Sequence, residues 1–427
     1  MMSFRNGSKR LSRRAFLGGA LVAGFGATNS AVAAQSLTQT TLDSIINAPR
    51  RGSWGDQFDA PASRNAVRVR SSVPILSPET MRKAEAAIAA YEDIVLRGGW
   101  PIVPSAKGLR LGDNDPAVSI LRQRLIVSGD LPPSTGTSPA FDSYVDGAVK
   151  RFQARHGLPA DGVLGRHSYA ALNVSATIRL GQLQTNLDRL RATPEDLGYR
   201  YVAVNIPAAQ IEAVEGHRVV LRHTAVVGKT SRQTPILNSK IHEIILNPYW
   251  TAPRSIIEKD IMPLMRKDPT YLTRNSIRLF DNRGNEVAPE TIDWSAEEAP
   301  QLMFRQDPGR INAMSSTKIN FHNRHAVYLH DTPEQSKFGQ LLRFESSGCV
   351  RVENVRDLST WLLRDTVGWD RQTMEQVIAS GVSTPVELAE EVPIYFIYVT
   401  AWSTSDGVVQ FRDDIYRLDG VGKLALQ

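Results

Sequence analysis

The residues of this chain best suited to covalent chemistry are its only cysteine, Cys349, and a histidine that precedes it, His330. Cys349 lies in the sequence FESSGCVRV and His330 in the sequence VYLHDT. A histidine can take the thiol proton, and the thiolate that forms is the nucleophile. Backbone N–H groups beside Ser347 and Gly348 can then face the oxyanion that forms when the sulfur attacks a carbonyl. The pattern predicts acyl transfer or amide hydrolysis.

The competing interpretation is that Cys349 is a small buried residue and His330 a structural one. The N-terminus weighs against it. Arg13 and Arg14 precede an apolar, glycine-rich run and a small-residue site at Ala31–Ala33, which predicts a cleaved twin-arginine signal peptide over 1–33 and export to the periplasm. An uncleaved membrane anchor is less suitable, because the run is short and rich in glycine. Exported proteins usually pair their cysteines, so an unpaired thiol needs a reason.

The charge of the chain also depends on that segment. Lys and Arg number 50 against 44 Asp and Glu, and the first 33 residues hold five of the basic residues and no acidic one. The remainder is close to neutral, so the basic composition does not indicate nucleic-acid binding. Charged residues interrupt every later apolar run, so we expect contact with the membrane only during export. The length predicts two or three domains.

The first half of the chain has helical periodicity. After an arm at 34–75 that we expect to be flexible or loosely docked, Ser77 and Pro78 predict the start of a helix that ends before Gly98. A compact helical unit follows at 109–173, and a leucine-rich helix follows that unit. We expect the two flanking segments, 76–108 and 174–198, to form one helical scaffold into which the unit is inserted.

From residue 199 the apolar residues alternate, which predicts strands. We expect strands at 201–206, 210–214, 218–222, 224–228, 241–246, 326–330 and 392–402, the last turning into 408–411 through a hairpin. The polar, proline-containing segment 251–320 interrupts this pattern and is either a lid or a peripheral decoration. Residues 417–427 form a tail. The predicted fold is multidomain α+β, with a mainly β catalytic domain at 199–416, an inserted cap, a small all-α domain and a helical scaffold.

The unit at 109–173 resembles the type 1 peptidoglycan-binding domain. The resemblance rests on the sequence AVKRFQ at 148–153, Gly157-Leu158, Asp161-Gly162, Gly165 and Ala171-Leu172. An inserted loop rich in Pro, Ser and Thr at 131–139 departs from the pattern. The resemblance implies binding to the cell wall, with a spacer role as the alternative.

Residues 199–416 resemble the YkuD-type catalytic domain of L,D-transpeptidases, and within it the large Gram-negative (YcbB-like) members with an inserted peptidoglycan-binding module. The sequences VYLHDTP at 327–333 and SSGCVRV at 346–352 carry the resemblance, with support from NPYWTAP at 247–253 and RQDPG at 305–309. The resemblance implies that Cys349 is the nucleophile and His330 its base. It also implies reaction with carbapenems.

The reaction implied is the formation of 3→3 cross-links in peptidoglycan. Cys349 would attack the amide before the terminal D-Ala of a tetrapeptide stem, and a diaminopimelate amine of a second stem would resolve the thioester. The resemblance implies no metal and no organic cofactor. The expected partners are peptidoglycan stem peptides, and the sequence does not identify protein partners.

Other residues receive roles with open alternatives. Tyr328 shares a strand face with His330 and can hydrogen-bond the oxyanion or pack in the sheet. Ser347 and Gly348 line the cleft and shape the backbone. Arg351 can bind a substrate carboxylate or form an ion pair within the protein. Trp250 is an aromatic wall of the cleft or a core residue.

Asp331 follows His330 directly, yet we do not expect a catalytic triad. Adjacent strand residues face opposite ways, and a backbone carbonyl can orient the imidazole instead.

Rival functions are a carboxypeptidase or hydrolase that uses the same thioester, attachment of a lipoprotein to the wall, a non-catalytic wall-binding scaffold, and a papain-like protease. The last would place its histidine after the cysteine, unlike this chain.

Overall fold

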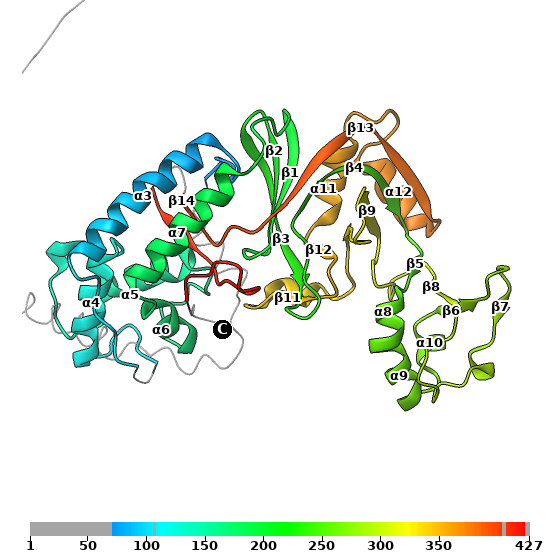
Figure 1. The fold of residues 1–427 in the computed structure, drawn as a ribbon, viewed down its shortest axis with the longest axis horizontal. Helices are drawn as coiled ribbons and strands as arrows, with labels where there is room; N and C mark the ends of the chain where they lie inside the picture. Colours follow the sequence, from blue (N-terminus) through cyan, green and yellow to red (C-terminus); the bar gives the residue numbers. More distant parts are fainter. Residues whose placement is uncertain (1–70, 106–107, 404–406, 423–427) are drawn as a thin grey trace, which may run out of the picture. The chain divides into compact units, whose positions relative to one another are not determined.

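A computed structural model describes residues 71–105, 108–403 and 407–422, and all of these fall within the unit Asp59–Gln427 (Figure 1). The predicted signal peptide and most of the predicted arm lie outside the described residues. The last residues of that arm are described, and they correspond to the docked alternative. Ile75 is buried, and its backbone N–H donates to Glu212 at 2.9 Å. This part of the arm is therefore docked on the protein.

The second half of the chain is built on a nine-stranded sheet among the described residues, in the order β11-β3-β12-β10-β9-β4-β13-β1-β2. Because β3 also pairs with β2, the sheet closes on itself into a barrel. The strands are β1 (Arg200–Asn205), β2 (Gln210–Glu215), β3 (Arg218–Gly228), β4 (Leu237–Leu246), β9 (Thr317–Phe321), β10 (Leu329–His330), β11 (Phe344–Ser346), β12 (Val350–Val352) and β13 (Thr384–Ile397).

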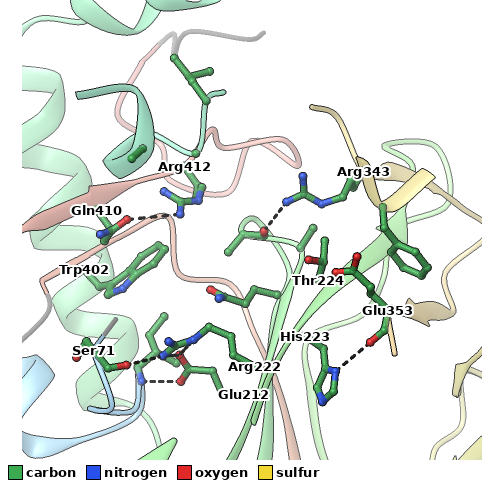
Figure 2. Close-up of a pocket in the computed structure, with 18 of the residues that line it drawn as sticks. Ser71, Glu212, Arg222, His223, Thr224, Arg343, Glu353, Trp402, Gln410 and Arg412 are labelled. Atoms are coloured by element: carbon green, nitrogen blue, oxygen red, sulfur yellow. Dashed lines mark hydrogen bonds and ion pairs between the residues drawn. The ribbon is translucent and has the colours of Figure 1, made fainter. Parts of the chain in front are cut away.

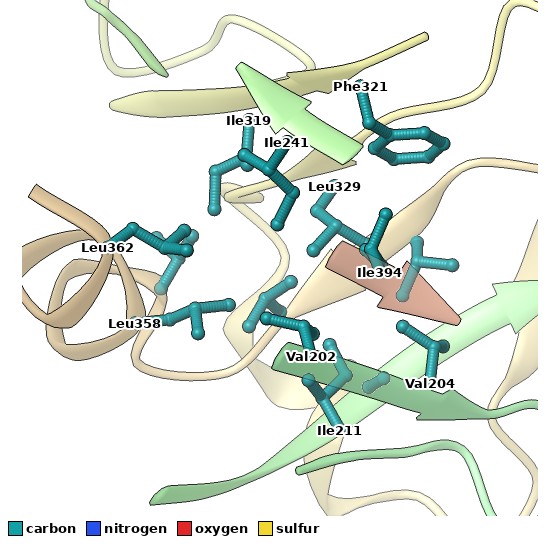
Figure 3. Packing of buried hydrophobic residues seen from close by; sticks show 14 of the residues in the cluster. Val202, Val204, Ile211, Ile241, Ile319, Phe321, Leu329, Leu358, Leu362 and Ile394 are labelled. Atoms are coloured by element: carbon teal, nitrogen blue, oxygen red, sulfur yellow. The ribbon is translucent and has the colours of Figure 1, made fainter. Parts of the chain in front are cut away.

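Apolar side chains that alternate along these strands fill the barrel (Figure 3). Val202 and Val204 of β1 point into this core beside Ile319 of β9, and helix α11 (Val355–Leu363) adds Leu358 from one side. The intervening residues of β1 belong to a second core that also contains Ile75, Leu76 and Leu190. Strand β1 is therefore buried on both faces, which accounts for its nearly continuous apolar sequence. Helix α12 (Arg371–Ser380) follows α11 in the chain.

The helical scaffold forms as the sequence predicts. Helix α3 (Pro78–Leu96) is capped by the Ser77 side chain, which accepts from the Thr80 N–H, and α3 packs against α7 (Ala176–Arg191). Between them lie α4 (Pro116–Val127), η1 (Pro133–Thr135), α5 (Ser143–Arg155) and α6 (Arg166–Leu172), which share a separate core. No helix in the described part of the chain combines the length and apolar character that a membrane crossing requires.

The segment between β4 and β9 is a small α+β module with its own core, hereafter the cap module. It contains β5 (Trp250–Thr251), α8 (Arg254–Ile256), the π-helical turn η2 (Ile257–Ile261), α9 (Met262–Lys267), α10 (Tyr271–Arg274), β6 (Ile277–Phe280), β7 (Glu286–Val287), η3 (Pro289–Thr291) and β8 (Met303–Gln306). Its strands pair in the order β5-β8-β6-β7. The predicted boundary at residue 320 is wrong, because Ile319 packs in the barrel core as part of β9.

Several strand predictions also need correction. The strands expected at 218–222 and 224–228 form one strand, β3. The strand expected at 326–330 shortens to β10, since Ala326 has a φ of 53°. The strand expected at 392–402 breaks after Ile397, and β14 (Ala401–Ser403) pairs separately with β15 (Val409–Phe411). The turn residues 404–406 lie outside the described residues.

The first residues of the expected tail pack on the protein, because Asp419 is buried and forms an ion pair with Arg189. The 3₁₀ turn η4 (Gln335–Gly339) precedes β11.

Candidate active site

Strand register brings the predicted site residues together. Strand β10 pairs with β9 on one side, where His330 is opposite Lys318, and with β12 on the other, where His330 is opposite Arg351. Directly paired residues project from the same face of a sheet, so these three side chains form one row across three strands. Leu329 and Val350 point the other way, into the barrel core. The row is hereafter the Lys318–His330–Arg351 row.

Tyr328 and Cys349 adjoin this row. The Tyr328 ring lies 5.5 Å from the His330 ring, edge to face, and the Val350 N–H donates to the Tyr328 carbonyl at 3.1 Å. Cys349 is half-buried and free, and it precedes β12 directly. Hydrogen bonding with Tyr328 lowers the pKa of the Cys349 thiol, which places this tyrosine beside the sulfur. Residues from three strands and one loop therefore converge beside the thiol.

The imidazole of His330 is held by a backbone carbonyl. Its Nδ1–H donates to the Asp331 carbonyl at 2.5 Å, which leaves Nε2 unprotonated. Burial, followed by the charge of Arg351, lowers the pKa of His330 to about 4. The Asp331 carboxylate is used elsewhere, since it accepts from the Ser316 hydroxyl at 2.6 Å and from the Thr332 N–H at 2.8 Å. The His330 side chain is thus a neutral base at neutral pH, and the Asp331 carboxylate does not form a catalytic triad with it.

The loop that presents Cys349 is fixed by hydrogen bonds on both sides. Gly348 has a φ of 117°, a conformation that favours glycine, and its carbonyl accepts from the buried Thr234 hydroxyl at 2.8 Å. The Ser346 hydroxyl donates to the Cys349 carbonyl at 2.5 Å. Burial raises the pKa of the Cys349 thiol, and hydrogen bonds from Tyr328 are the leading opposing influence. Cys349 is therefore a neutral thiol before it reacts.

Tyr328 and Trp250 connect the sulfur to the cap module. Burial raises the pKa of Tyr328 well above its ordinary value, so its hydroxyl keeps its proton and can donate. Hydrogen bonding with Trp250 acts against this rise in the pKa of Tyr328, which places the indole beside the tyrosine. Trp250 also packs, partly buried, against the core of the cap module. Trp250 therefore lies beside Tyr328 on one side and against the core of the cap module on the other.

The remaining predicted residues lie at the edges of the site. Arg351 forms an ion pair with Glu334 at 2.5 Å, which is the intramolecular alternative for this arginine. Ser347 is exposed, and its hydroxyl accepts from Arg232 at 2.8 Å. Arg232 also forms an ion pair at 2.5 Å with Asp260 of η2 in the cap module. Arg232 thus links the cap module to the residue two positions before Cys349.

Three residues of the site escaped the sequence analysis: Thr234, Arg232 and Lys318. Thr234 and Arg232 lie between β3 and β4, and they reach the cysteine loop across more than a hundred residues of chain. No local pattern marks them. Lys318 carried a signal, because it is a basic residue in the otherwise alternating segment TKINF and so marks the polar face of a strand.

A cavity of about 330 Å³ lies apart from these residues (Figure 2). It gathers side chains from the barrel, from the end of α5 and from the β14–β15 hairpin, with Arg343 and Arg412 reaching toward it from opposite sides. Its arginines are already engaged within the protein: Arg222 pairs with Glu212 at 2.8 Å, and Arg412 donates to the Arg155 carbonyl at 3.1 Å. None of the predicted site residues lines it. We therefore do not assign the chemistry to this cavity.

Comparison with known families identifies two domains. Residues 199–387 match the YkuD model, described as the L,D-transpeptidase catalytic domain. Residues 114–172 match the model described as "Putative peptidoglycan binding domain". The chain therefore contains a YkuD-type L,D-transpeptidase catalytic domain and a type 1 peptidoglycan-binding domain. Both agree with the resemblances found in the sequence, and the multidomain α+β prediction is confirmed.

Two relatives and one solved structure complete the comparison. The chain is 36% identical over 239 residues to a "Putative L,D-transpeptidase" of Haemophilus influenzae, covering 56% of this chain and 48% of that protein. It is 40% identical over 81 residues to the N-acetylmuramoyl-L-alanine amidase CwlM of Mycobacterium tuberculosis, covering 17% of this chain and 20% of that protein. The chain thus spans half or less of the length of these relatives. An L,D-transpeptidase from Xylanimonas cellulosilytica matches 69% of this chain and 99% of its own, with 17% identity and a TM-score of 0.22, too low to support any inference.

Proposed function

We propose that this protein is a periplasmic L,D-transpeptidase that forms 3→3 cross-links in peptidoglycan through a thioester on Cys349. The observation that carries the proposal is the state of His330, a buried and neutral imidazole whose Nδ1–H is committed to the Asp331 carbonyl. Its Nε2 is then the available base in a site that also holds the only thiol of the chain. The matched catalytic domain supports a peptidoglycan-modifying enzyme.

The chemistry follows from these two groups. The S–H bond of Cys349 breaks as its proton moves to His330 Nε2, and the sulfur bonds to the carbonyl carbon before the terminal D-Ala of the donor stem. The Tyr328 hydroxyl and backbone N–H groups beside Gly348 are the proposed donors to the oxyanion. When the intermediate collapses, the C–N bond breaks and the leaving D-Ala amine takes the proton from His330. A diaminopimelate amine then attacks the thioester and gives its proton to His330. The C–S bond breaks, and the leaving sulfur takes that proton from His330 to restore the thiol.

Water is the competing acceptor, and it would make the protein a carboxypeptidase. The contacts of Arg232 favour the transferase, because they hold η2 of the cap module to Ser347 beside the nucleophile. We infer that the cap module closes over the bound stem and limits the access of water to the thioester. Attachment of a lipoprotein lysine would use the same thioester with a different amine, and no feature of the site favours it.

The experiment that separates these functions is incubation of the protein with purified tetrapeptide muropeptides, followed by mass spectrometry of the products. We expect cross-linked dimers and free D-Ala, and neither product with Cys349→Ala. Tripeptide and D-Ala without dimer would replace the transferase by a hydrolase. Retained turnover in Cys349→Ala would remove the proposed nucleophile, and a wild type without any product would contradict an enzymatic function.

Two further parts of the proposal concern location. We propose export by the twin-arginine pathway, based on Arg13 and Arg14. Replacing both with lysine should keep the protein in the cytoplasm, as measured by fractionation, and unchanged export would contradict this. We also propose that the domain at 114–172 holds the enzyme on the wall. Sedimentation with purified sacculi tests that binding, and loss of binding on deletion of the domain is the expected result.

A further inference from the structure

Lys318 occupies the polar face of a strand whose other face is core. Ile319 and Phe321 of β9 pack inside the barrel, so Lys318 and Asn320 project from the opposite side. Strand register then places Lys318 directly opposite His330. Lys318 is therefore one member of the row that contains the proposed base, although no motif of the sequence pointed to it.

The ammonium group of Lys318 lies over an aromatic ring of the site. Its Nζ is 4.5 Å from the centroid of the Tyr328 ring, and the side chain is half-buried. Among the residues that the structure describes, no carboxylate forms an ion pair with it within 4.0 Å. The nearby Glu243 instead accepts a hydrogen bond from Asn320 at 2.6 Å. A half-buried ammonium without a partner costs free energy unless another group offsets it.

The second cation of the row differs in this respect. Arg351 forms an ion pair with Glu334. Lys318 therefore supplies the positive charge of the row that no ion pair balances. Near Lys318, the group that becomes negative during the proposed reaction is the sulfur of Cys349. Burial lowers the pKa of Lys318, and the charge of Cys349 is the leading influence that raises the pKa of this lysine.

We propose that Lys318 is an electrostatic residue of the active site, which stabilises the negative charge on Cys349 as its proton leaves for His330. This proposal rests on the proposed role of Cys349 as nucleophile and adds a third side chain to the pair predicted from the sequence. The cation acts beside the face of Tyr328, and hydrogen bonding with this tyrosine also favours the thiolate of Cys349. A fixed ammonium in a partly dry site interacts with a thiolate far more strongly than it would in water.

The charged and titratable groups around the sulfur come from every neighbouring element. They are Tyr328 directly before β10, His330 of β10, Arg351 of β12 with Glu334, Lys318 of β9, Glu243 of β4, and Arg232 with Asp260 beside Ser347. Both His330 and Tyr328 are neutral at neutral pH, given the directions of their pKa values. Removal of Lys318 should therefore leave the thiol harder to ionise.

The test uses the single cysteine of the full chain and needs no peptidoglycan. The rate of alkylation by iodoacetamide is measured against pH for the wild type, Lys318→Met, Lys318→Gln and Lys318→Arg. We expect the thiol to titrate about one pH unit higher in the methionine and glutamine variants, with alkylation at pH 7 about tenfold slower. The arginine variant should stay close to the wild type, which a merely structural role would not predict. Lys240→Met removes an exposed lysine of β4 and is the matched control, with no expected change.

Profiles of Lys318→Met and Lys318→Gln that overlay the wild type would overturn the proposal. A shift in Lys240→Met of the same size, or an arginine variant as impaired as the methionine one, would overturn it too. Circular dichroism melting identifies any variant that fails to fold, and the glutamine variant is then compared with arginine. Because alkylation is independent of muropeptides, a lysine-dependent thiol in a protein that makes no cross-links would contradict the proposed function and leave this inference intact.

Discussion

Thr234→Val should damage both the stability and the chemistry of this protein. The Thr234 hydroxyl accepts from the Gly228 N–H and donates to the Gly348 carbonyl, each at 2.8 Å. Valine has the same shape without the hydroxyl, so it leaves two buried backbone groups without partners. Each costs about 1–3 kcal/mol, which predicts a loss of about 2–6 kcal/mol in the free energy of unfolding. Thr234→Ser keeps the hydroxyl and should lose about 1 kcal/mol for its missing methyl group.

The effect on chemistry arises at the peptide between Gly348 and Cys349. The Thr234 hydroxyl fixes the carbonyl of that peptide, and its N–H is a proposed donor to the oxyanion. A displacement of roughly 1 Å there is expected to slow acylation by on the order of 100-fold. Urea unfolding followed by circular dichroism measures the first effect, and the rate of thioester formation with a tetrapeptide donor measures the second. A valine variant that matches the serine variant in both would refute the role of this hydroxyl.

Two further perturbations follow from the same contacts. The pKa of His330 falls from its ordinary 6.5 to about 4 in the folded protein, so the unfolded chain takes up a proton at a higher pH than the folded protein does. The contribution of neutral His330 to the free energy of unfolding is therefore complete above about pH 6.5 and is lost as the pH falls toward 4. Urea unfolding at pH 7 and pH 5 should show about 2 kcal/mol more loss in the wild type than in His330→Gln, and equal losses would contradict the buried neutral state. Arg232→Ala removes the link between Asp260 and Ser347, so muropeptide products should shift from dimer toward tripeptide. Arg254→Ala, which breaks an exposed pair inside the cap module, should keep the wild-type ratio, and an equal ratio in both variants would show that the link does not control water.

Local signals predicted the parts of the fold that depend on local contacts. Ser77 caps the helix that follows it, as its position before Pro78 predicts. Alternation likewise located β1 and β2 within one residue of their observed ends. The sheet of the cap module was missed because its short strands pair over long separations, as Trp250 with Gln306 does. Two-residue strands leave no periodic pattern in a sequence.

The residues of the site also divide into those that local sequence indicates and those that only the folded chain reveals. Cys349 and His330 stand out by residue type and motif, and the orientation of His330 by a backbone carbonyl was expected from strand geometry. Thr234 acts through a hydrogen bond between segments 114 residues apart, which only the folded chain reveals. Lys318 required the strand register with β10, because its importance lies in being opposite His330. Sequence thus indicates the reacting groups, and the fold supplies the groups that hold and polarise them.

The central claim is that Cys349 forms a covalent acyl intermediate, and intact-mass spectrometry tests it most directly. The protein is mixed with a tetrapeptide donor in the absence of an amine acceptor, quenched in acid at short times, and digested to locate the adduct. The account predicts a mass increase equal to the donor minus D-Ala, located on Cys349, removed by hydroxylamine, and absent in Cys349→Ala. Release of D-Ala by a wild type that never carries this adduct, or an adduct that persists in Cys349→Ala, would contradict the account.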